Sequence, residues 1–255
     1  MNIIDENISL YSQSPDAFIA SMSLVRFLED KNRILIVGDC FGRDTKLFKG
    51  LGKEVFVVDI ASQEGIENFY CQSITEKTPF EDGFFDGVIM AEVLEHLFED
   101  YKALNEINRI LKPDGILAIT IPYLSNVQDQ PEYHVRMHSK KTLERLFAFC
   151  GFKIEEHFFR GFVTRLCQKN RLTKYLIFGP KKILKILFKE RGIRMWMHGC
   201  LKLESWLGKK RLFNRMQKTF ATYGGIMKCR KDVRIDFDKV QVSYFANMYG
   251  KQNDL

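Results

Sequence analysis

Short runs of consecutive apolar residues alternate along this chain with longer segments in which apolar residues recur at helical spacing. The runs at 34–37 and 55–58 consist only of Ile, Leu, Val and Phe, which is typical of a strand buried on both faces of a parallel sheet. Helix caps and Gly or Pro stops separate the segments. The pattern predicts strands at 34–37, 55–58, 69–72, 84–90, 116–121, 152–159 and 224–229, and helices at 14–30, 43–51, 101–111 and 139–150.

This alternation also predicts how the chain is organised. Strands that alternate with helices form β-α-β units and a mainly parallel sheet. After Phe162 the pattern changes to basic helical segments, and strand character returns only near residue 224. We therefore expect a core at 1–162, a basic helical insertion or lid at 163–221, and a final strand and C-terminal tail at 222–255 that complete the core.

Composition narrows the class of protein. The chain has 255 residues, of which 45% are hydrophobic and 28% charged, and these values are those of an ordinary globular protein. No apolar run approaches the roughly 18 residues of a spanning helix, and acidic Asp5 and Glu6 occupy the place where a signal peptide is basic. We therefore expect a cytoplasmic protein. The six cysteines are scattered without a C-x-x-C pair or a zinc-ligand histidine, so no metal site is expected.

The net charge of +7 is divided unevenly along the chain. Residues 1–164 carry 17 Lys and Arg against 26 Asp and Glu, whereas residues 165–231 carry 19 against 2. Within the basic part, residues 180–189 read Pro-Lys-Lys-Ile-Leu-Lys-Ile-Leu-Phe-Lys, which predicts an amphipathic helix with a lysine face and an apolar face. An asymmetry of this size indicates an anionic partner for the basic part.

Three interpretations of the basic segment follow from this pattern. It could be a helical lid whose apolar face packs on the core and whose lysines are solvated. It could contact an anionic membrane surface through residues 174–211, which suits Lys with Trp and Phe, and the protein would then be peripheral at the inner face of a membrane. It could bind a polyanionic acceptor, such as RNA or a phosphorylated glycan.

The loop between the first strand and its helix reads Gly38-Asp39-Cys40-Phe41-Gly42. Glycines let a backbone turn sharply and approach a ligand, and a helix N-terminus adds free N–H groups. Asp59 ends the next strand at the same edge of the sheet, where its carboxylate can accept hydrogen bonds from ribose hydroxyls. A dinucleotide loop requires G-x-G-x-x-G, but Cys40 and Arg43 occupy its second and third glycine positions. The loop therefore predicts an adenosine-type cofactor other than a dinucleotide.

Four segments occur in a fixed order and carry a family resemblance. They are Ile34–Ala61, Pro79–Ile89, Val93–Leu97 and Glu106–Gly115. Together they resemble the class I S-adenosylmethionine-dependent methyltransferases, type 11-like, and the chain is similar to methyltransferases of polysaccharide biosynthesis. The resemblance implies an α/β fold with a Rossmann-like, doubly wound sheet of seven mostly parallel strands, in which the last strand is antiparallel and follows the basic insertion. It also implies methyl transfer from the sulfonium of S-adenosyl-L-methionine.

The resemblance implies a set of residues that bind this cofactor, namely Gly38, Asp39, Cys40, Gly42, Asp59, Ile60, Ser73, Ile74, Ala91 and Glu92. The chain departs from the family at three positions, since Ile36 replaces an acid, Cys40 a glycine and Ser73 an acid. Asp39 is therefore expected either to face the methionine ammonium of the cofactor or to cap the following helix.

Histidines at the same edge are the candidates for acid–base work. Methyl transfer mainly requires alignment of nucleophile, methyl and sulfur, and an oxygen or nitrogen acceptor also gives up a proton. His134 lies in the loop after the fifth predicted strand, and we favour it as base or acceptor-binding residue. His96 follows the strand before it and is expected either to act in catalysis or to pack within its loop. Tyr123 is expected to line the pocket, and His138 to cap a helix start.

The acceptor is inferred by elimination and analogy. Methyltransferases of nucleic-acid amino groups usually carry N/D-P-P-Y/F after the fourth strand, and this chain has Ala91–Leu94 there, so nucleic acid is the less favoured partner. We expect O-methylation of a saccharide or lipid-linked glycan. The alternatives are a non-catalytic binding protein of the same fold, in which the altered loop no longer binds cofactor, and an RNA methyltransferase.

Overall fold

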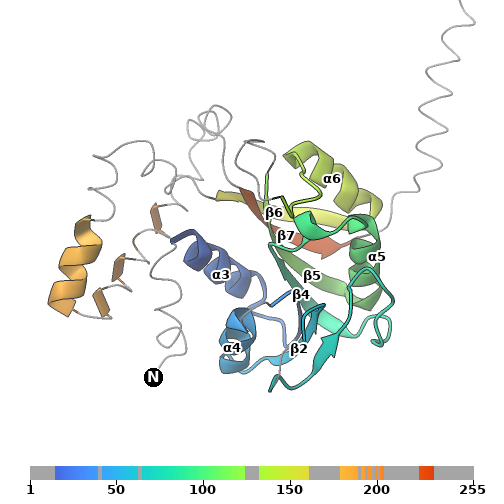
Figure 1. Cartoon of the computed structure of the whole chain (residues 1–255), viewed down its shortest axis with the longest axis horizontal. Helices are drawn as coiled ribbons and strands as arrows, with labels where there is room; N and C mark the ends of the chain where they lie inside the picture. Colours follow the sequence, from blue (N-terminus) through green and yellow to red (C-terminus); the bar gives the residue numbers. More distant parts are fainter. Residues whose placement is uncertain are drawn as a thin grey trace, which may run out of the picture.

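The computed structural model describes residues 15–39, 42–62, 65–123, 132–160, 179–188, 191–192, 195–196, 199, 202–203 and 224–232. Their centre is a seven-stranded sheet with the strand order β3-β2-β1-β4-β5-β7-β6 (Figure 1). The strands are β1 (Arg33–Val37), β2 (Glu54–Asp59), β3 (Phe69–Cys71), β4 (Phe85–Ala91), β5 (Leu111–Pro122), β6 (Phe152–Arg160) and β7 (Gly224–Lys231). The helices are α3 (Pro15–Phe27), α4 (Arg43–Gly50), the 3-10 turn η1 (Leu94–His96), α5 (Asp100–Ile110) and α6 (Lys140–Phe149).

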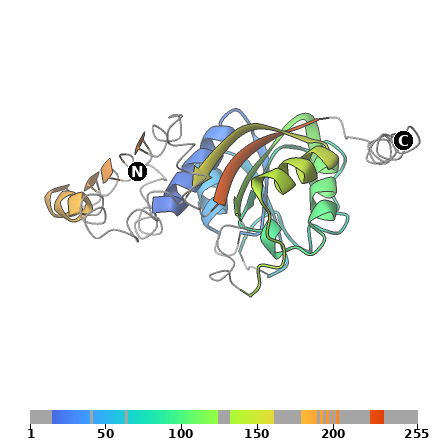
Figure 2. The ribbon, with the colours of Figure 1, turned by 90° about the horizontal axis from the view of Figure 1, so that it is seen from above.

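The topology of the sheet is that of a doubly wound α/β fold. Strands β1 to β5 pair in parallel, whereas β7 is antiparallel to both of its neighbours, β5 and β6. The expected sheet of seven mostly parallel strands with an antiparallel last strand is therefore confirmed. The last strand lies inside the sheet, where it forms the join between β5 and β6 (Figure 2).

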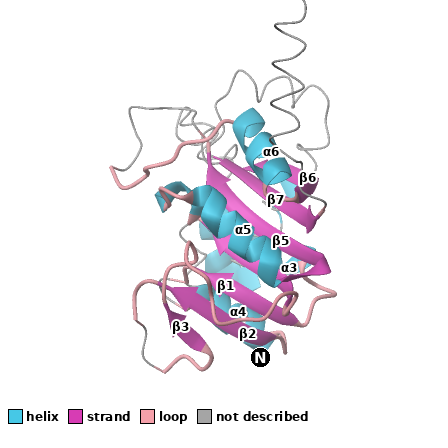
Figure 3. Ribbon diagram, turned by 90° about the vertical axis from the view of Figure 1, so that its right-hand side faces the viewer, coloured by secondary structure: helices cyan, strands magenta, loops and turns pink. Residues whose placement is uncertain are grey.

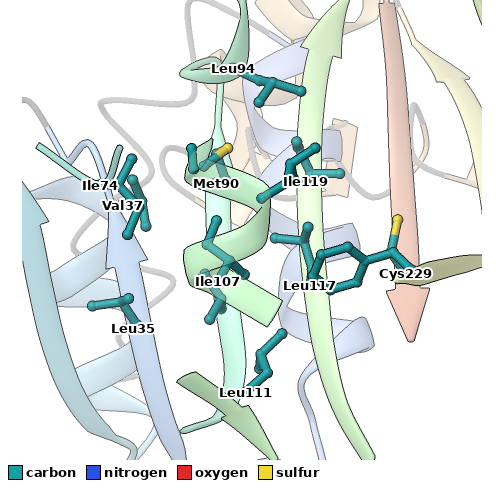
Figure 4. Close-up of a cluster of buried hydrophobic side chains, with 14 of the residues drawn as sticks. Leu35, Val37, Ile74, Met90, Leu94, Ile107, Leu111, Leu117, Ile119 and Cys229 are labelled. Carbon is teal, nitrogen blue, oxygen red and sulfur yellow. The ribbon is translucent and has the colours of Figure 1, made fainter. Parts of the chain in front are cut away.

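Each face of the sheet carries its own hydrophobic core. Leu35 and Val37 of β1 point into one core, with α5 and α6, and Ile34 and Ile36 point into the other, with α3 and α4 (Figure 3). All four side chains are at most 2% exposed. Figure 4 shows how the first core gathers Leu35, Val37 and Ile107 with side chains of β4 and β5. A strand buried on both faces needs apolar residues at every position, which is why its sequence is a continuous apolar run.

Only part of the expected insertion at 163–221 lies among the described residues. Residues 179–188 are helical, as the pattern at 180–189 predicts, and isolated residues up to 203 follow. Within the described part of the chain, no helix combines the length and the apolar character needed to cross a bilayer. The remainder of the predicted insertion falls outside the described residues.

A partly buried ion pair fixes the segment before β4 to α5. Glu106 is 8% exposed and accepts hydrogen bonds from the backbone N–H (2.7 Å) and the hydroxyl (2.6 Å) of Thr78. Arg109 donates to Glu106 from Nε (2.9 Å) and Nη2 (2.5 Å), and to the carbonyl of Phe80 (2.8 Å). Burial alone would raise the pKa of Glu106, but the hydrogen bonds from Arg109 and Thr78 outweigh it and lower that pKa.

We expect Glu106→Ala to lower the free energy of unfolding by about 3 kcal/mol, because the variant leaves a partly buried guanidinium and a buried hydroxyl without their shared acceptor. Urea denaturation followed by circular dichroism measures the loss. The matched control is Glu99→Ala at the start of the same helix, which removes an exposed ion pair with Lys102 (2.6 Å) and is expected to leave the midpoint unchanged. Equal midpoints for wild type and Glu106→Ala would contradict the role given to Glu106.

Candidate functional site

The carboxyl ends of the parallel strands meet at one edge of the sheet. From β1 the chain runs to α4 and β2 on one side, and from β4 it runs to α5 and β5 on the other. Because α4 and α5 cover opposite faces, the strand order reverses between β1 and β4. Ligands of open α/β sheets bind at such a reversal, outside the carboxyl ends of the strands. The fold thus directs attention to the residues that follow Val37, Asp59 and Ala91.

Gly38 holds three of these strand ends together. Its φ of +70° lies in the region that favours glycine, and its N–H donates to the carbonyl of Val58 at the end of β2 (2.9 Å). A Cβ at Gly38 would lie 2.5 Å from Cγ2 of Val93, which follows β4. Only glycine therefore lets the loop after β1 lie this close to the segment after β4. Gly42, with a φ of +62°, begins α4, whereas Cys40 lies outside the described residues.

Asp39 caps the helix that follows the loop. Its Oδ2 accepts a hydrogen bond from the backbone N–H of Thr45 (2.8 Å) and its Oδ1 from that of Asp44 (3.3 Å), and the residue is 4% exposed. Of the two roles expected from the sequence, the helix cap is therefore present in the structure. Contact with a cofactor ammonium stays a prediction.

Asp59 lies where the sequence predicts, at the end of β2. It is half-buried, and its Oδ1 accepts a hydrogen bond from the N–H of Ala61 (2.9 Å), which fixes the carboxylate at the edge. Ile60 beside it is 78% exposed, which is unusual for so apolar a side chain. Of the next pair of predicted residues, Ile74 is buried in the core, while Ser73 accepts a hydrogen bond from the N–H of Thr75 (3.2 Å).

Glu92 departs from ordinary backbone geometry at the end of β4. Its φ of +56° lies in the left-handed region that residues other than glycine rarely adopt. Two contacts with Thr120 of β5 hold it there, since the N–H of Glu92 donates to the Thr120 carbonyl (3.0 Å) and its Oε1 accepts from the Thr120 hydroxyl (2.8 Å). Strained residues of this kind gather at functional sites. The family resemblance implied that Glu92 binds the cofactor. Its strained backbone is a structural feature that the sequence pattern alone did not reveal.

The structure brings two of the predicted histidines together. The rings of His96, in η1, and His134 lie edge to face with centroids 4.9 Å apart. Nδ1 of His96 is 3.1 Å from the carbonyl oxygen of Tyr133, so the chain before α6 contacts the turn after β4. Partial burial and then the neighbouring His96 lower the pKa of His134, and Glu92 opposes them with a smaller effect.

A buried carboxylate completes this group. Glu95 is 1% exposed, its carbonyl accepts from the N–H of Arg136 (3.0 Å), and its Oε1 lies 3.9 Å from Nε2 of His96. One ligand atom from each of Glu95, His96 and His134 lies within 4.8 Å of the others, close enough to surround a cation. Sequence reasoning missed Glu95. The only signal was its place beside His96 in an apolar run, which predicts burial but not its proximity to a histidine far along the chain.

Tyr123 contacts a histidine that the sequence did not single out. The hydroxyl of Tyr123 lies 2.5 Å from Nε2 of His157, on β6, and Tyr123 as a whole is only 6% exposed. Burial, and then the charge of Lys140, lower the pKa of His157 to about 4. The imidazole is thus neutral at pH 7, and its Nε2 shares a hydrogen bond with the Tyr123 hydroxyl. Gly225 of β7 lies directly against this hydroxyl, where a Cβ would clash.

His138 is placed differently from the expectation that it caps a helix start. The cap of α6 is Ser139, whose hydroxyl accepts a hydrogen bond from the N–H of Thr142 (3.2 Å). His138 instead contacts the buried carboxylate of Asp100 through Nε2 (2.9 Å), and Arg136 contacts the same carboxylate (3.3 Å). These contacts fix the chain before α6 to the start of α5 and so support the position of His134.

Comparison with known proteins agrees with this geometry. The family profile described as "Methyltransferase domain" matches residues 35–119. A ubiquinone/menaquinone biosynthesis C-methyltransferase of Pectobacterium carotovorum is 31% identical over 105 residues, which are 34% of this chain and 42% of that protein. An O-methyltransferase of Aspergillus nomiae is 34% identical over 87 residues, or 31% of this chain and 39% of the relative. The chain thus spans less than half the length of these curated relatives.

The fold extends the likeness beyond the matched segment. The crystal structure of an S-adenosylmethionine-dependent methyltransferase from Archaeoglobus fulgidus aligns over 82% of this chain and 90% of its own, with a TM-score of 0.57 and 17% sequence identity. At that identity the likeness concerns the fold alone. Residues 35–119 match a methyltransferase domain, and the fold around them is similar to that of an S-adenosylmethionine-dependent methyltransferase.

Proposed function

We propose that this chain transfers a methyl group from S-adenosylmethionine to a hydroxyl group of a saccharide or lipid-linked glycan. The observation that carries the proposal is the pair His96 and His134, whose rings lie 4.9 Å apart at the carboxyl edge of the sheet. One histidine follows β4, and the other lies in the chain before α6, so that two separate segments place imidazoles beside the cofactor edge.

The residues at this edge fit the cofactor. The turn at Gly38 presents backbone without a side chain, which allows close approach of a ligand. Asp59 offers a half-buried carboxylate for the two ribose hydroxyls, and exposed Ile60 beside it offers an apolar surface for the adenine ring. The strained backbone of Glu92 lies across from them at the end of β4. A cofactor held by these residues would supply its methyl group at the same edge of the sheet as the histidines.

The cofactor supplies a methyl group on a positively charged sulfur, so the carbon itself needs no acid or base. The acceptor hydroxyl must lose its proton while its oxygen bonds to the methyl carbon and the carbon–sulfur bond breaks with its electron pair remaining on sulfur. His134 takes this proton. Its lowered pKa keeps the imidazole neutral near pH 7 and therefore able to accept. His96, held at the Tyr133 carbonyl, positions the second ring against it.

The choice of acceptor has separate support. The curated relatives are named as C- and O-methyltransferases. The preference for oxygen therefore rests on the base assigned to His134, whose pKa is lowered. The preference for saccharide rests on the sequence likeness to polysaccharide methyltransferases. The departures at Ile36 and Cys40 in the glycine loop favour the alternative of a non-catalytic binding protein, and the basic segment favours RNA as the alternative acceptor. The assays below separate these cases.

Asp59→Ala is expected to weaken S-adenosylmethionine binding at least tenfold, because two hydrogen bonds to a charged acceptor are lost. Isothermal titration calorimetry measures the dissociation constant. The control is Glu54→Ala, which removes a carboxylate from the opposite end of the same strand, where it pairs with Arg33 (2.9 Å). Equal weakening in both variants would point to a general loss of structure and would remove Asp59 from the cofactor site.

Asp39 can be assigned with two variants. Asp39→Ala removes the cap of α4 and is expected to lower the free energy of unfolding by about 1 kcal/mol, while Asp39→Ser keeps an acceptor for the N–H of Thr45 and recovers most of it. The affinity for S-adenosylmethionine, measured on the same pair, separates the two roles. An affinity lost in both variants assigns the carboxylate to the cofactor ammonium, whereas an affinity that follows stability limits Asp39 to the cap.

His134→Ala is expected to lower kcat about 100-fold or more while leaving cofactor affinity within about twofold, because the variant removes a base and no cofactor contact. Transfer of tritiated methyl to a lipid-linked saccharide measures turnover. For the wild type, kcat/KM should fall as pH drops through an apparent pKa below 6.5, since protonated His134 cannot accept, and the variant should lack this limb.

Other outcomes of this assay decide between the alternatives. Label in RNA but not in saccharide would contradict the proposed acceptor. Absence of S-adenosylmethionine binding would favour the non-catalytic alternative, in which the altered loop no longer binds cofactor. We expect a chelator to leave turnover unchanged. Turnover lost to the chelator and restored by a divalent cation would instead give Glu95, His96 and His134 the role of holding that cation.

A further inference from the structure

The helix formed by residues 179–188 exposes most of its apolar side chains. Ile186 is 80% exposed, Leu187 65%, Ile183 59% and Phe188 49%. Met195, a short distance along the chain, is 56% exposed. Single exposed apolar residues are ordinary on a protein surface, but several on one short helix form a patch that marks an interaction site. A lid packed on the core by its apolar face would bury these side chains, but in the described part of this helix they are exposed.

The lysines lie on a separate arc of the same helix. At about 100° per residue, Lys181, Lys182 and Lys185 fall within roughly one third of the circumference, and the apolar residues occupy the remainder. Lys182 and Lys185 are exposed. Ile186 lies next to Lys182 around the helix, so the apolar and basic arcs share a solvent-facing border.

One side of the helix is held by the chain that follows it. Gly192 lies directly against the carbonyl of Leu184, where a Cβ would clash, so the chain folds back at this point. Trp196 is 5% exposed, and the ammonium of Lys181 lies 5.1 Å from the centroid of its ring. Leu184 and Lys181 are half-buried on this side. The helix is therefore supported from one side, with Ile183, Ile186 and Leu187 facing outward.

We propose that this outward face binds an anionic membrane surface, with the helix lying in the plane of the interface. The isoleucines and the leucine enter the boundary of headgroups and acyl chains, and the neighbouring lysines contact lipid phosphates. A nucleic acid would be contacted by the lysines but would leave the apolar arc in water. Charge along the chain agrees with this choice, because residues 165–231 carry 19 basic against 2 acidic side chains, while residues 1–164 carry an excess of acidic ones.

The same charge division orients the protein. The acidic core is repelled by an anionic surface that attracts the basic segment, so the molecule approaches with the helix foremost. Binding in this mode does not depend on the identity of the methyl acceptor, and its test is separate from that of the proposed function.

The experiment is flotation of the full chain with vesicles of phosphatidylcholine alone or with one quarter phosphatidylglycerol. The wild type should bind the anionic vesicles at least tenfold more tightly than the neutral ones, and raising the salt concentration to 0.5 M, about a 4 Å screening length, should weaken binding. The double variant Ile186→Asn with Leu187→Asn should bind the anionic vesicles at least tenfold more weakly than the wild type. The double variant Lys182→Glu with Lys185→Glu should lose the part of vesicle binding that depends on the salt concentration. Leu51→Ser, an exposed leucine at the end of α4, is the control and should bind as wild type.

Two further measurements make the result decisive. Circular dichroism shows that each variant retains its fold, and calorimetry with S-adenosylmethionine keeps a failure of membrane binding distinct from a failure of the methyltransferase proposal. Wild type that stays unbound with anionic vesicles would overturn the proposal. Self-association that sedimentation detects in the wild type but not in Ile186→Asn with Leu187→Asn, without vesicle binding, would overturn it in favour of a second copy. RNA binding that depends on Lys182 and Lys185, again without vesicle binding, would overturn it in favour of nucleic acid.

Discussion

Burial of the central strands on both faces is the constraint on which the rest of this structure depends. β1 sends Leu35 and Val37 into one core and Ile34 and Ile36 into the other, and none of them has room for a polar neighbour. A polar group inside such a sheet would lose its hydration without a partner. The chemistry of the protein is therefore confined to the strand ends, where backbone groups and side chains meet solvent. Gly38 shows how tightly those ends are gathered, because a single methyl group there would clash with Val93.

The same constraint explains what could be predicted from the sequence. Strands buried on both faces appear as continuous apolar runs, so β1 and β2 were predicted from residue type alone, and Asp59 was placed because it ends such a run. The position of β7 between β5 and β6 is different. Its residues at 224–231 indicate a strand, but the partners of a strand depend on contacts far along the chain. That part of the fold came from a family resemblance and not from the local pattern.

At the candidate site too, the local sequence pattern predicts some features, and others depend on contacts far along the chain. Which residues lie at the edge could be predicted, but their contacts could not. Asp39 had two equal roles in the sequence, and the geometry shows the hydrogen bonds of a helix cap. The positive φ of Glu92 arises from its two bonds to Thr120 of a neighbouring strand, and the partner of Tyr123 is His157, 34 positions away. Such pairs are tertiary contacts, and the spacing of residues within one segment does not predict them.

The grouping of Glu95, His96 and His134 links the fold to its chemistry. Glu95 is almost fully buried, and the chain carrying His134 is fixed by Arg136 and His138, both of which contact the buried carboxylate of Asp100. Several ionisable groups are thus held near one another at a desolvating edge, an arrangement that stabilises the fold little and perturbs pKa values readily. A histidine that merely packed within its loop would not need a second imidazole against it. The arrangement suits the proton transfer proposed for His134, because one imidazole is held against another at the edge where the strands end.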